Sequence, residues 1–157
     1  MAGHAGLGTK LTMSTAALTS TSFSPGGVAV LIGELTNIGG PTMSADQIDV
    51  SSHDSTGIFR EFVAGFKDAG EISLEGNLTV GGGADDLLGA FKDRVTRNFH
   101  INFPVSSTSA VNESYLRWEL AGTVSGVETA VPYDDKAGFS ASVRLSGAPT
   151  LVHTTTT

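Results

Sequence analysis

Apolar and polar residues alternate one by one through several segments of the chain. This period of two is typical of half-buried antiparallel strands, which turn one face to a core and the other to water. In the segment Glu71–Val80, Ile72 and Leu74 share one face while Glu71 and Glu75 share the other. The same alternation predicts strands over Gln47–Ser51, Phe99–Val105, Leu116–Val124 and Phe139–Leu145, and a short strand over Lys10–Met13.

Two segments depart from this alternation. Val28–Leu35 is apolar at almost every position, which predicts a strand covered on both faces. Between Leu87 and Val95 apolar residues recur at helical spacing instead, and they predict one helix over Asp85–Arg94. Acidic residues at the start of this segment and basic residues near its end complement the helix dipole.

These elements together predict a mainly β fold: an antiparallel β-sandwich or barrel of about seven strands with one flanking α-helix. The length of 157 residues suits one domain. We expect that domain over residues 10–152, with a flexible Gly-rich arm at 1–9 and a frayed polar tail at 153–157. A turn is expected at Ser22–Gly27, where Pro25 precedes two glycines.

The connection between the predicted strands at Gln47–Ser51 and Glu71–Val80 is long and apolar. It spans residues 52–70, and connections of this length are usually functional or disordered. Surface loops are normally polar, so two interpretations stay open. The segment folds back on its own core as a lid, or it buries its apolar side chains on a neighbouring subunit. The candidate interface residues are Ile58, Phe59, Arg60, Phe62, Val63 and Phe66.

Negative charge dominates the whole chain and the two strands around this connection. The formal net charge is −7, and the predicted polar faces carry Asp49, Glu71 and Glu75 with no Lys or Arg. If these two strands form one hairpin, its water-exposed surface is neutral to acidic. Ordinary solubility charge accounts for the same pattern. The sequence lacks the basic patch that is typical of proteins that bind nucleic-acid phosphates.

No group of residues in the sequence predicts catalysis or a cofactor. The chain has no cysteine, which excludes disulfides, zinc thiolates and cysteine nucleophiles. The pairs Asp85–Asp86 and Asp134–Asp135 are interpreted as a helix start and a turn. Neither a signal peptide nor a membrane helix is expected, and synthesis in a cytoplasm fits these features. The four histidines lack metal-ligand spacing and are interpreted as solvated: His4, His53, His100 and His153.

Two segments carry more specific motifs. The first includes Ile48-Asp49-Val50, Asp54-Ser55-Thr56-Gly57, Arg60-Glu61-Phe62, Gly65-Phe66-Lys67-Asp68-Ala69-Gly70-Glu71 and Glu75-Gly76-Asn77. The second is Val131-Pro132-Tyr133-Asp134-Asp135-Lys136, followed by an alternating strand and Ser146-Gly147-Ala148-Pro149-Thr150-Leu151. With a helix and a strand between these motifs, the chain from Lys10 to Leu151 resembles the tail tube proteins of lambda-like, long-tailed, non-contractile phages.

The resemblance implies a structural subunit of the virion tail and not an enzyme. Such proteins are β-sandwiches with a flanking helix, related in fold to the tube protein of type VI secretion. They join their sheets into hexameric rings, and the rings stack into a tube. Their long loop contacts neighbouring subunits or rings, and their inner wall is acidic. Asp49, Glu71 and Glu75 are the candidates for that wall here.

The resemblance also implies the partners. These are further copies of the chain, the tape-measure protein, and the terminator and initiator proteins of the tail. DNA is a non-specific passenger through the channel, and neither a cofactor, nor a metal, nor membrane binding is implied.

Two alternatives to a phage tail tube remain at this point. The first is the tube protein of a secretion system or of a tail-derived particle with the same fold. The second is a β-sandwich binding module, which is expected to display clustered aromatic residues around a site. The single tryptophan, Trp118, lies in an alternating segment and is interpreted as core.

Overall fold

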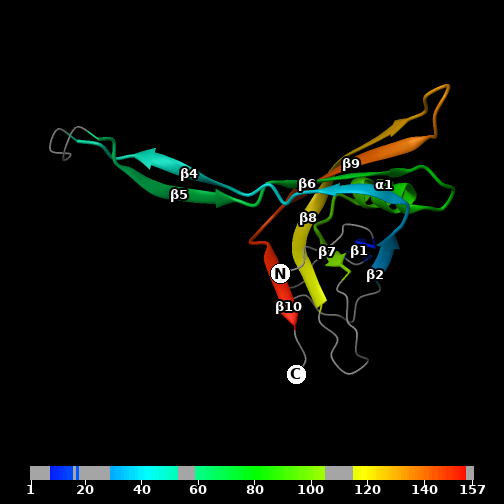
Figure 1. Ribbon diagram of the computed structural model, residues 1–157, viewed down its shortest axis with the longest axis horizontal. Coiled ribbons are helices and arrows are strands. Elements are labelled where there is room, and N and C mark those ends of the chain that lie inside the picture. Colours follow the sequence, from blue (N-terminus) through cyan, green and yellow to red (C-terminus); the bar gives the residue numbers. More distant parts are fainter. Residues whose placement is uncertain (1–7, 16, 18–28, 53–58, 105–114, 155–157) are drawn as a thin grey trace.

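The computed structural model describes residues 8–15, 17, 29–52, 59–104 and 115–154, and Figure 1 shows its arrangement. Nearly all of its regular structure is antiparallel strand, with one helix among the described residues, which confirms the predicted mainly β fold. The elements are β1 (Lys10–Ser14), β2 (Ala29–Ile32), β3 (Leu35–Gly39), β4 (Ser44–Asp49), β5 (Phe62–Asp68), β6 (Glu71–Asn77), α1 (Gly83–Asp93), β7 (Arg97–Phe103), β8 (Tyr115–Ala130), β9 (Gly138–Leu145) and β10 (Thr150–Thr154).

Strand β8 connects two parts of the main sheet, because its first and second parts pair with different strands. The strand order is β2-β1-β7-β8-β9-β6-β3, and β10 also pairs with β8. The first part of β8 pairs with β7 on one side and β10 on the other, whereas its second part pairs with β9. We call β2, β1, β7, β10 and residues 115–122 of β8 the β7 half. Residues 122–130 of β8 with β9, β6 and β3 form the β6 half.

The two halves meet at Gly122, which pairs with Arg97 of β7 and with Leu145 of β9. A Cβ atom at Gly122 would lie 2.7 Å from the carbonyl oxygen of Arg144, so this corner requires glycine. A register shift between Val124 and Gly126 follows directly. Bulges of this kind bend a strand and let it pass from one layer to the next.

The core is formed by the inward faces of the two halves, as the alternation predicts, and by buried residues of α1. In β6, Ile72 and Leu74 are buried while Glu71, Ser73 and Glu75 are exposed. Trp118 packs against this core and is partly buried. The buried apolar residues are Leu11, Met13, Ile32, Ile72, Leu74, Ala84, Leu87, Ala90, Phe99, Ile101, Leu120, Val124, Phe139, Ala141, Val143 and Leu145.

Several element boundaries differ from the predictions. Strand β4 begins at Ser44 and not at Gln47, β6 ends at Asn77 and not at Val80, and β8 continues beyond Val124 to Ala130. The helix begins two residues before the predicted Asp85 and ends at Asp93. The single strand predicted over Val28–Leu35 is wrong. Strand β2 ends at Ile32, Gly33 and Glu34 are not in a strand, and β3 begins at Leu35. Glu34 has a φ of 60°, which no regular strand accommodates.

The tail predicted at 153–157 is also wrong in part. His153 and Thr154 belong to β10, which pairs along β8, so the polar character of this end did not indicate its structure. Residues 155–157, residues 1–7 of the predicted arm and the turn predicted at Ser22–Gly27 lie outside the described residues.

The largest correction concerns residues 52–70. The second half of the predicted loop is strand β5, which pairs with β4 in a separate two-stranded sheet. The hairpin considered between Gln47–Ser51 and Glu71–Val80 therefore does not form. Strand β6 instead pairs with β3 and β9 inside the main sheet.

Candidate assembly interface

Strands β4 and β5 project from the main sheet as a long hairpin, which we call the arm (Figure 1). Every residue of β4 is exposed, and so is every residue of β5 except Gly65. An isolated two-stranded hairpin is marginally stable in water. The arm therefore displays both of its faces without burying either against the core.

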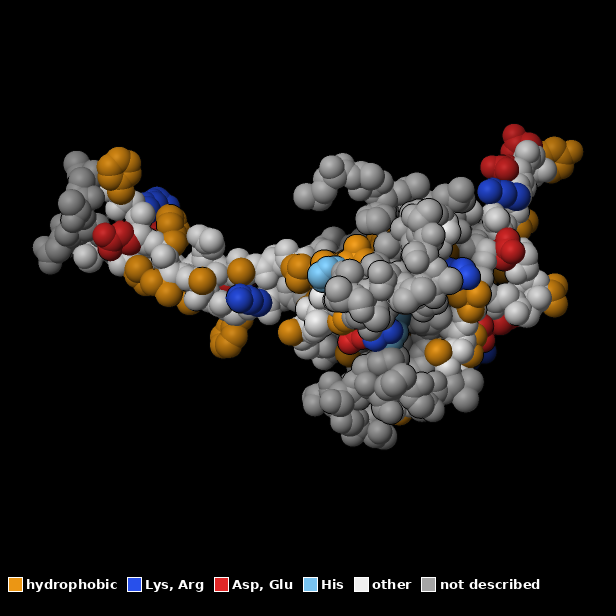
Figure 2. Space-filling view, turned by 60° about the horizontal axis from the view of Figure 1, so that its bottom comes forward, with side chains coloured by type: hydrophobic (Ala, Val, Ile, Leu, Met, Phe, Trp, Pro, Cys, Tyr) orange, Lys and Arg blue, Asp and Glu red, His pale blue; other side chains and the backbone are white. Residues whose placement is uncertain are grey.

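Apolar side chains occupy both faces of the arm. Ile48 lies directly opposite Val63 on one face, and Phe62 lies opposite Asp49 on the other. At Gly65 a Cβ atom would lie 3.1 Å from the Cβ atom of Asp46, so this position leaves little room for a side chain. Figure 2 shows apolar side chains spread along the arm between charged ones. Exposed apolar surface of this extent marks an interaction site.

The predicted interface residues lie on this arm, apart from Ile58, which is outside the described residues. Phe59, Phe62, Val63 and Phe66 are all exposed, Phe66 to 89%. The interpretation of the segment as a lid on its own core is wrong for these four side chains. Their contact with other subunits stays a prediction.

Polar contacts hold the arm at its root. The amide of Thr42 donates to the carbonyl of Glu71 over 3.3 Å, and the amide of Glu71 donates to Oγ1 of Thr42 over 3.2 Å. The amide of Leu145 in β9 donates to the carbonyl of Gly70 over 2.9 Å. Gly70 adopts a φ of 73°, a conformation that favours glycine. The root is thus fixed to the main sheet, whereas the strands of the arm beyond it pair only with each other.

An ion pair adds to this attachment. Asp68 at the end of β5 pairs with the guanidinium of Arg144 in β9. A carboxylate oxygen of Asp68 also accepts the amide of Gly70 over 2.8 Å. These two contacts, the hydrogen bond from Gly70 first and then Arg144, lower the pKa of Asp68. Asp68 thereby joins the arm, the turn and the main sheet.

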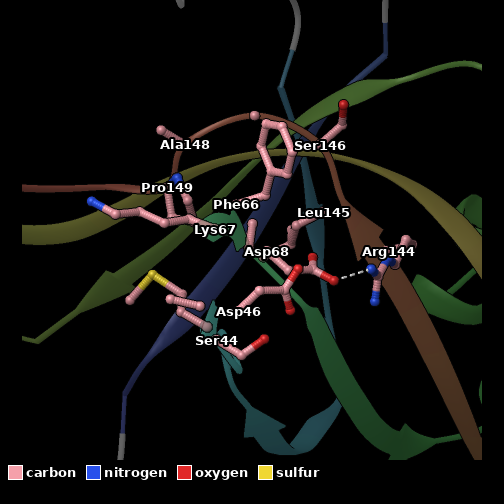
Figure 3. Close-up of a pocket in the computed structure, with 14 residues that line it drawn as sticks. Ser44, Asp46, Phe66, Lys67, Asp68, Arg144, Leu145, Ser146, Ala148 and Pro149 are labelled. Carbon is pink, nitrogen blue, oxygen red and sulfur yellow. Dashed lines mark hydrogen bonds and ion pairs between the residues drawn. The ribbon is translucent and has the colours of Figure 1, made fainter. Parts of the chain in front are cut away.

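A pocket of about 1020 Å³ lies at the root of the arm, which we call the root pocket (Figure 3). It is lined from the arm by residues such as Met43, Phe66 and Lys67, and from the end of β9 and the segment after it by Leu145 and Pro149. Its lining is therefore mixed, with apolar side chains beside the ion pair of Asp68 and Arg144.

The outward side of the β6 half is polar, and we call it the polar face. Its charged residues are Glu71, Glu75, Glu128 and Arg144, and serines and threonines fill most of the rest: Thr123, Ser73, Ser140 and Ser142. Two of the predicted wall residues, Glu71 and Glu75, lie on this face, and Glu75 accepts a hydrogen bond from Asn37 over 3.4 Å.

Asp49, the third predicted wall residue, lies apart on the arm. Its carboxylate is 3.9 Å from Arg60 and accepts the amide of Ser51 over 2.9 Å, and hydrogen bonds from Ser51 lower its pKa. The structure does not bring Asp49 together with Glu71 and Glu75. It places Arg144 directly opposite Glu71 instead, so the polar face carries a cation beside these carboxylates.

Other chemistry is sparse in the described part of the chain. No group of three or more His, Asp or Glu side chains in it is placed to hold a metal ion, and no helix in it has the length and apolarity to cross a membrane. The solvated interpretation is wrong for His100, which is only 6% exposed. Burial first, and then the charge of Arg117, lower its pKa, while Glu119 opposes them. His153 is exposed, and His4 and His53 lie outside the described residues.

Comparison with known proteins identifies the family. The model of the lambda phage tail tube protein family matches residues 15–152, which is nearly the whole chain. The chain belongs to this family. It is a structural subunit of a phage tail tube, which confirms the resemblance carried by the sequence motifs. None of the curated proteins compared with the chain matches it.

Solved structures of tail proteins share the fold of this tail tube protein. The tail of an empty gene transfer agent particle, refined with C6 symmetry, has a TM-score of 0.61 at 17% identity over 90% of this chain and 95% of that chain. The SPP1 tail tube has a TM-score of 0.65 at 12% identity over 98% and 80%. The anti-feeding prophage baseplate has a TM-score of 0.62 at 9% identity over 97% and 95%. Identities this low show the fold alone.

Proposed function

We propose that copies of this chain close into hexameric rings by joining the open edges of their β6 halves. Among the described residues, β3 pairs only with β6, and residues 123–130 of β8 pair only with β9. These two open edges lie on opposite sides of one four-stranded layer, and this is the observation that carries the proposal. Pairing one edge with the other extends the layer from copy to copy and removes both edges.

Such a contact joins different surfaces of the two copies, so it closes only as a ring. The C6 symmetry applied to the gene transfer agent tail supports six copies. Rings then stack into a tube, and we assign the arm to contacts with neighbouring subunits or rings. Its apolar residues have no partner in the core of their own chain.

The polar face then becomes the wall of the channel, and DNA is its passenger. Its carboxylates outnumber its single arginine, which Asp68 already neutralises. DNA carries a negative charge about every 1.7 Å, so a basic wall would retain it, whereas an acidic one lets it slide. The tape-measure, initiator and terminator proteins are the further partners that this role requires.

Proline at position 36 tests the ring contact. The register shift in β3 leaves Thr36 without a partner in β6, so Thr36→Pro should leave that pairing intact while it blocks a new strand at the open edge. We expect a folded monomer that forms no rings by negative-stain electron microscopy, whereas Thr36→Val forms rings and tubes. Normal rings from Thr36→Pro would show that β3 is not the joining edge.

A tail-derived particle is the second candidate, because gene transfer agent and anti-feeding prophage proteins share this fold. A secretion-system tube is a further member of that group. In the proposed ring, these candidates differ from one another in whether DNA passes through the channel. DNA release from particles assembled with this chain would exclude a secretion tube or another particle that carries no DNA.

A further inference from the structure

The root pocket exposes apolar side chains that nothing in the described structure covers. Phe66 lines it and is 89% exposed, and Met43 beside it is also exposed. A volume of about 1020 Å³ is large enough to receive several side chains. Two charged groups on its lining, Asp46 and Lys67, form no ion pair within the described part of the chain.

The turn between β8 and β9 is a projection, in contrast to the root pocket. Residues 131–136, which we call the tip, project beyond the sheet, and Figure 2 shows acidic, basic and apolar side chains gathered there. Val131 and Tyr133 are exposed, Tyr133 completely. Asp134 and Asp135 follow, and then Lys136. The tip therefore offers an aromatic ring flanked by charges of both signs.

The pocket and the tip lie at opposite ends of the same strand. Strand β9 begins at Gly138, paired with Ala130 directly before the tip. It ends at Leu145, which lines the pocket and bonds to Gly70. Its eight residues span about 25 Å, so a tip cannot reach the pocket of its own chain. A copy displaced along the strand direction brings its tip to that pocket.

We propose that the tip of one copy seats in the root pocket of a copy in the next ring, with Tyr133 against Phe66. This inference rests on the proposed stacking of rings. The charges match in this arrangement, because Asp134 and Asp135 meet Lys67 while Lys136 meets Asp46. Apolar contact supplies the affinity, and the charge pairs set the register. The contact joins head to tail, so it repeats along the tube without closing.

Paired cysteines test the contact, since the natural chain has none. In Tyr133→Cys/Ala148→Cys tubes, one thiol lies on the tip and the other on the pocket lining. A disulfide requires Cα atoms within about 7 Å, and therefore it forms only between copies. Mild oxidation of tubes verified by microscopy should give a ladder of linked chains on a denaturing gel.

The controls are the two single-cysteine variants and Tyr133→Cys/Leu88→Cys, in which the second thiol lies on the exposed face of α1. None of them should form the ladder. If Tyr133→Cys/Ala148→Cys forms tubes but gives no ladder, the contact between tip and root pocket is excluded, while the ring proposal is unaffected. A dimer from Tyr133→Cys alone would place tip against tip and also overturn it. Failure of the natural chain to form any tube contradicts the proposed function, and the seat with it.

Charge exchange gives an independent test. Lys67→Glu should reduce tube length at least several-fold without unfolding the monomer, because it sets like charges against Asp134 and Asp135. Adding Asp134→Lys and Asp135→Lys to that variant should restore long tubes. Restoration supports the seat. Equal loss in the single and combined variants would overturn the charge pairing and assign Lys67 to another contact.

Discussion

Arg144 is the only cation on the polar face of the β6 half, and Asp68 lies beside it at the root of the arm. The two residues form an ion pair across elements that serve different purposes. In the proposed channel, an unpaired arginine repeated in every subunit would attract DNA phosphates. In that channel Asp68 has a second function besides holding the arm: it neutralises Arg144 and so prevents Arg144 from retaining DNA.

Asp68→Asn should increase DNA retention by assembled tubes several-fold, most strongly at low salt, because it leaves Arg144 bare. The asparagine oxygen still accepts the amide of Gly70, so the turn is preserved. Arg144→Gln should retain no more DNA than the natural chain, and Asp68→Asn/Arg144→Gln should return to the natural level. Retention is measured by filter binding of a labelled duplex. If both single variants lose assembly equally, the pair is only a structural brace.

Gly70 fixes the chain where the arm joins the sheet. Gly70→Ala should lower the free energy of unfolding by more than about 2 kcal/mol, because a Cβ atom overlaps the carbonyl oxygen of Thr42 in a left-handed backbone conformation. Gly81→Ala is the matched control: Gly81 also has positive φ, yet no atom lies within 4 Å of its Cβ position. It should cost about 1–2 kcal/mol. Urea denaturation compares them, and equal losses would contradict the overlap.

His100 predicts a pH dependence of stability. Burial lowers its pKa in the folded chain, so the unfolded state, with a pKa near its usual value of about 6.5, binds the proton more readily. Stability should therefore be complete above about pH 6.5 and fall as the pH decreases below it. His100→Asn should flatten this slope between about pH 7.5 and 5.5, as followed by thermal unfolding. An unchanged slope would assign the effect to another group.

At the scale of elements, the arm is the part that the main sheet does not stabilise. Phe62→Asp should abolish tube formation and leave the thermal unfolding of the monomer nearly unchanged, because Phe62 is exposed and touches no core. Phe62→Tyr should still assemble, since it retains most of the apolar area. Phe99→Asp, at a fully buried position, shows what unfolding looks like in the same assay. If Phe62→Asp unfolds instead, Phe62 contributes to the stability of the monomer, and the arm is not only an assembly element.

The elements also show what the sequence can and cannot reveal. Strands β6 and β9 were predictable because one face of each is buried, and burial imposes alternation. Strand β5 was missed because both faces of the arm are exposed and both carry apolar side chains, such as Phe62 on one and Val63 on the other, so its sequence does not alternate. The break at Glu34 was missed for a different reason: its backbone conformation leaves no signal in hydropathy.

The candidate site was predictable only in its composition. The apolar residues of 52–70 indicated either a lid or an interface, but the partner of each strand depends on contacts far apart in the chain. Glu71 and Arg144 are separated in the sequence by α1, β7 and β8 and yet lie opposite each other. The alternation within Phe139–Leu145 placed Arg144 on a polar face, without indicating that β6 is the neighbouring strand.

At the scale of the whole molecule, the polar face and the net charge of −7 act together. Glu71→Lys/Glu75→Lys should allow tubes to form but slow DNA release from virions several-fold, because the wall then attracts phosphates. Glu71→Gln/Glu75→Gln should give a smaller effect, so that the delay follows charge. Release is measured with a DNA-binding dye. Normal release from the lysine variant would exclude these residues from the wall.

Strand β8 gives the tube a mechanical property. Its 16 residues, about 50 Å of extended chain, run without interruption from one half of the sheet into the other. In the proposed ring, its second part belongs to the channel wall and its first part to the layer that includes β7 and β10. Tension on either layer therefore passes to the other along covalent bonds. Two separate sheets would transmit it only through side-chain packing, and would shear more easily when a tail bends.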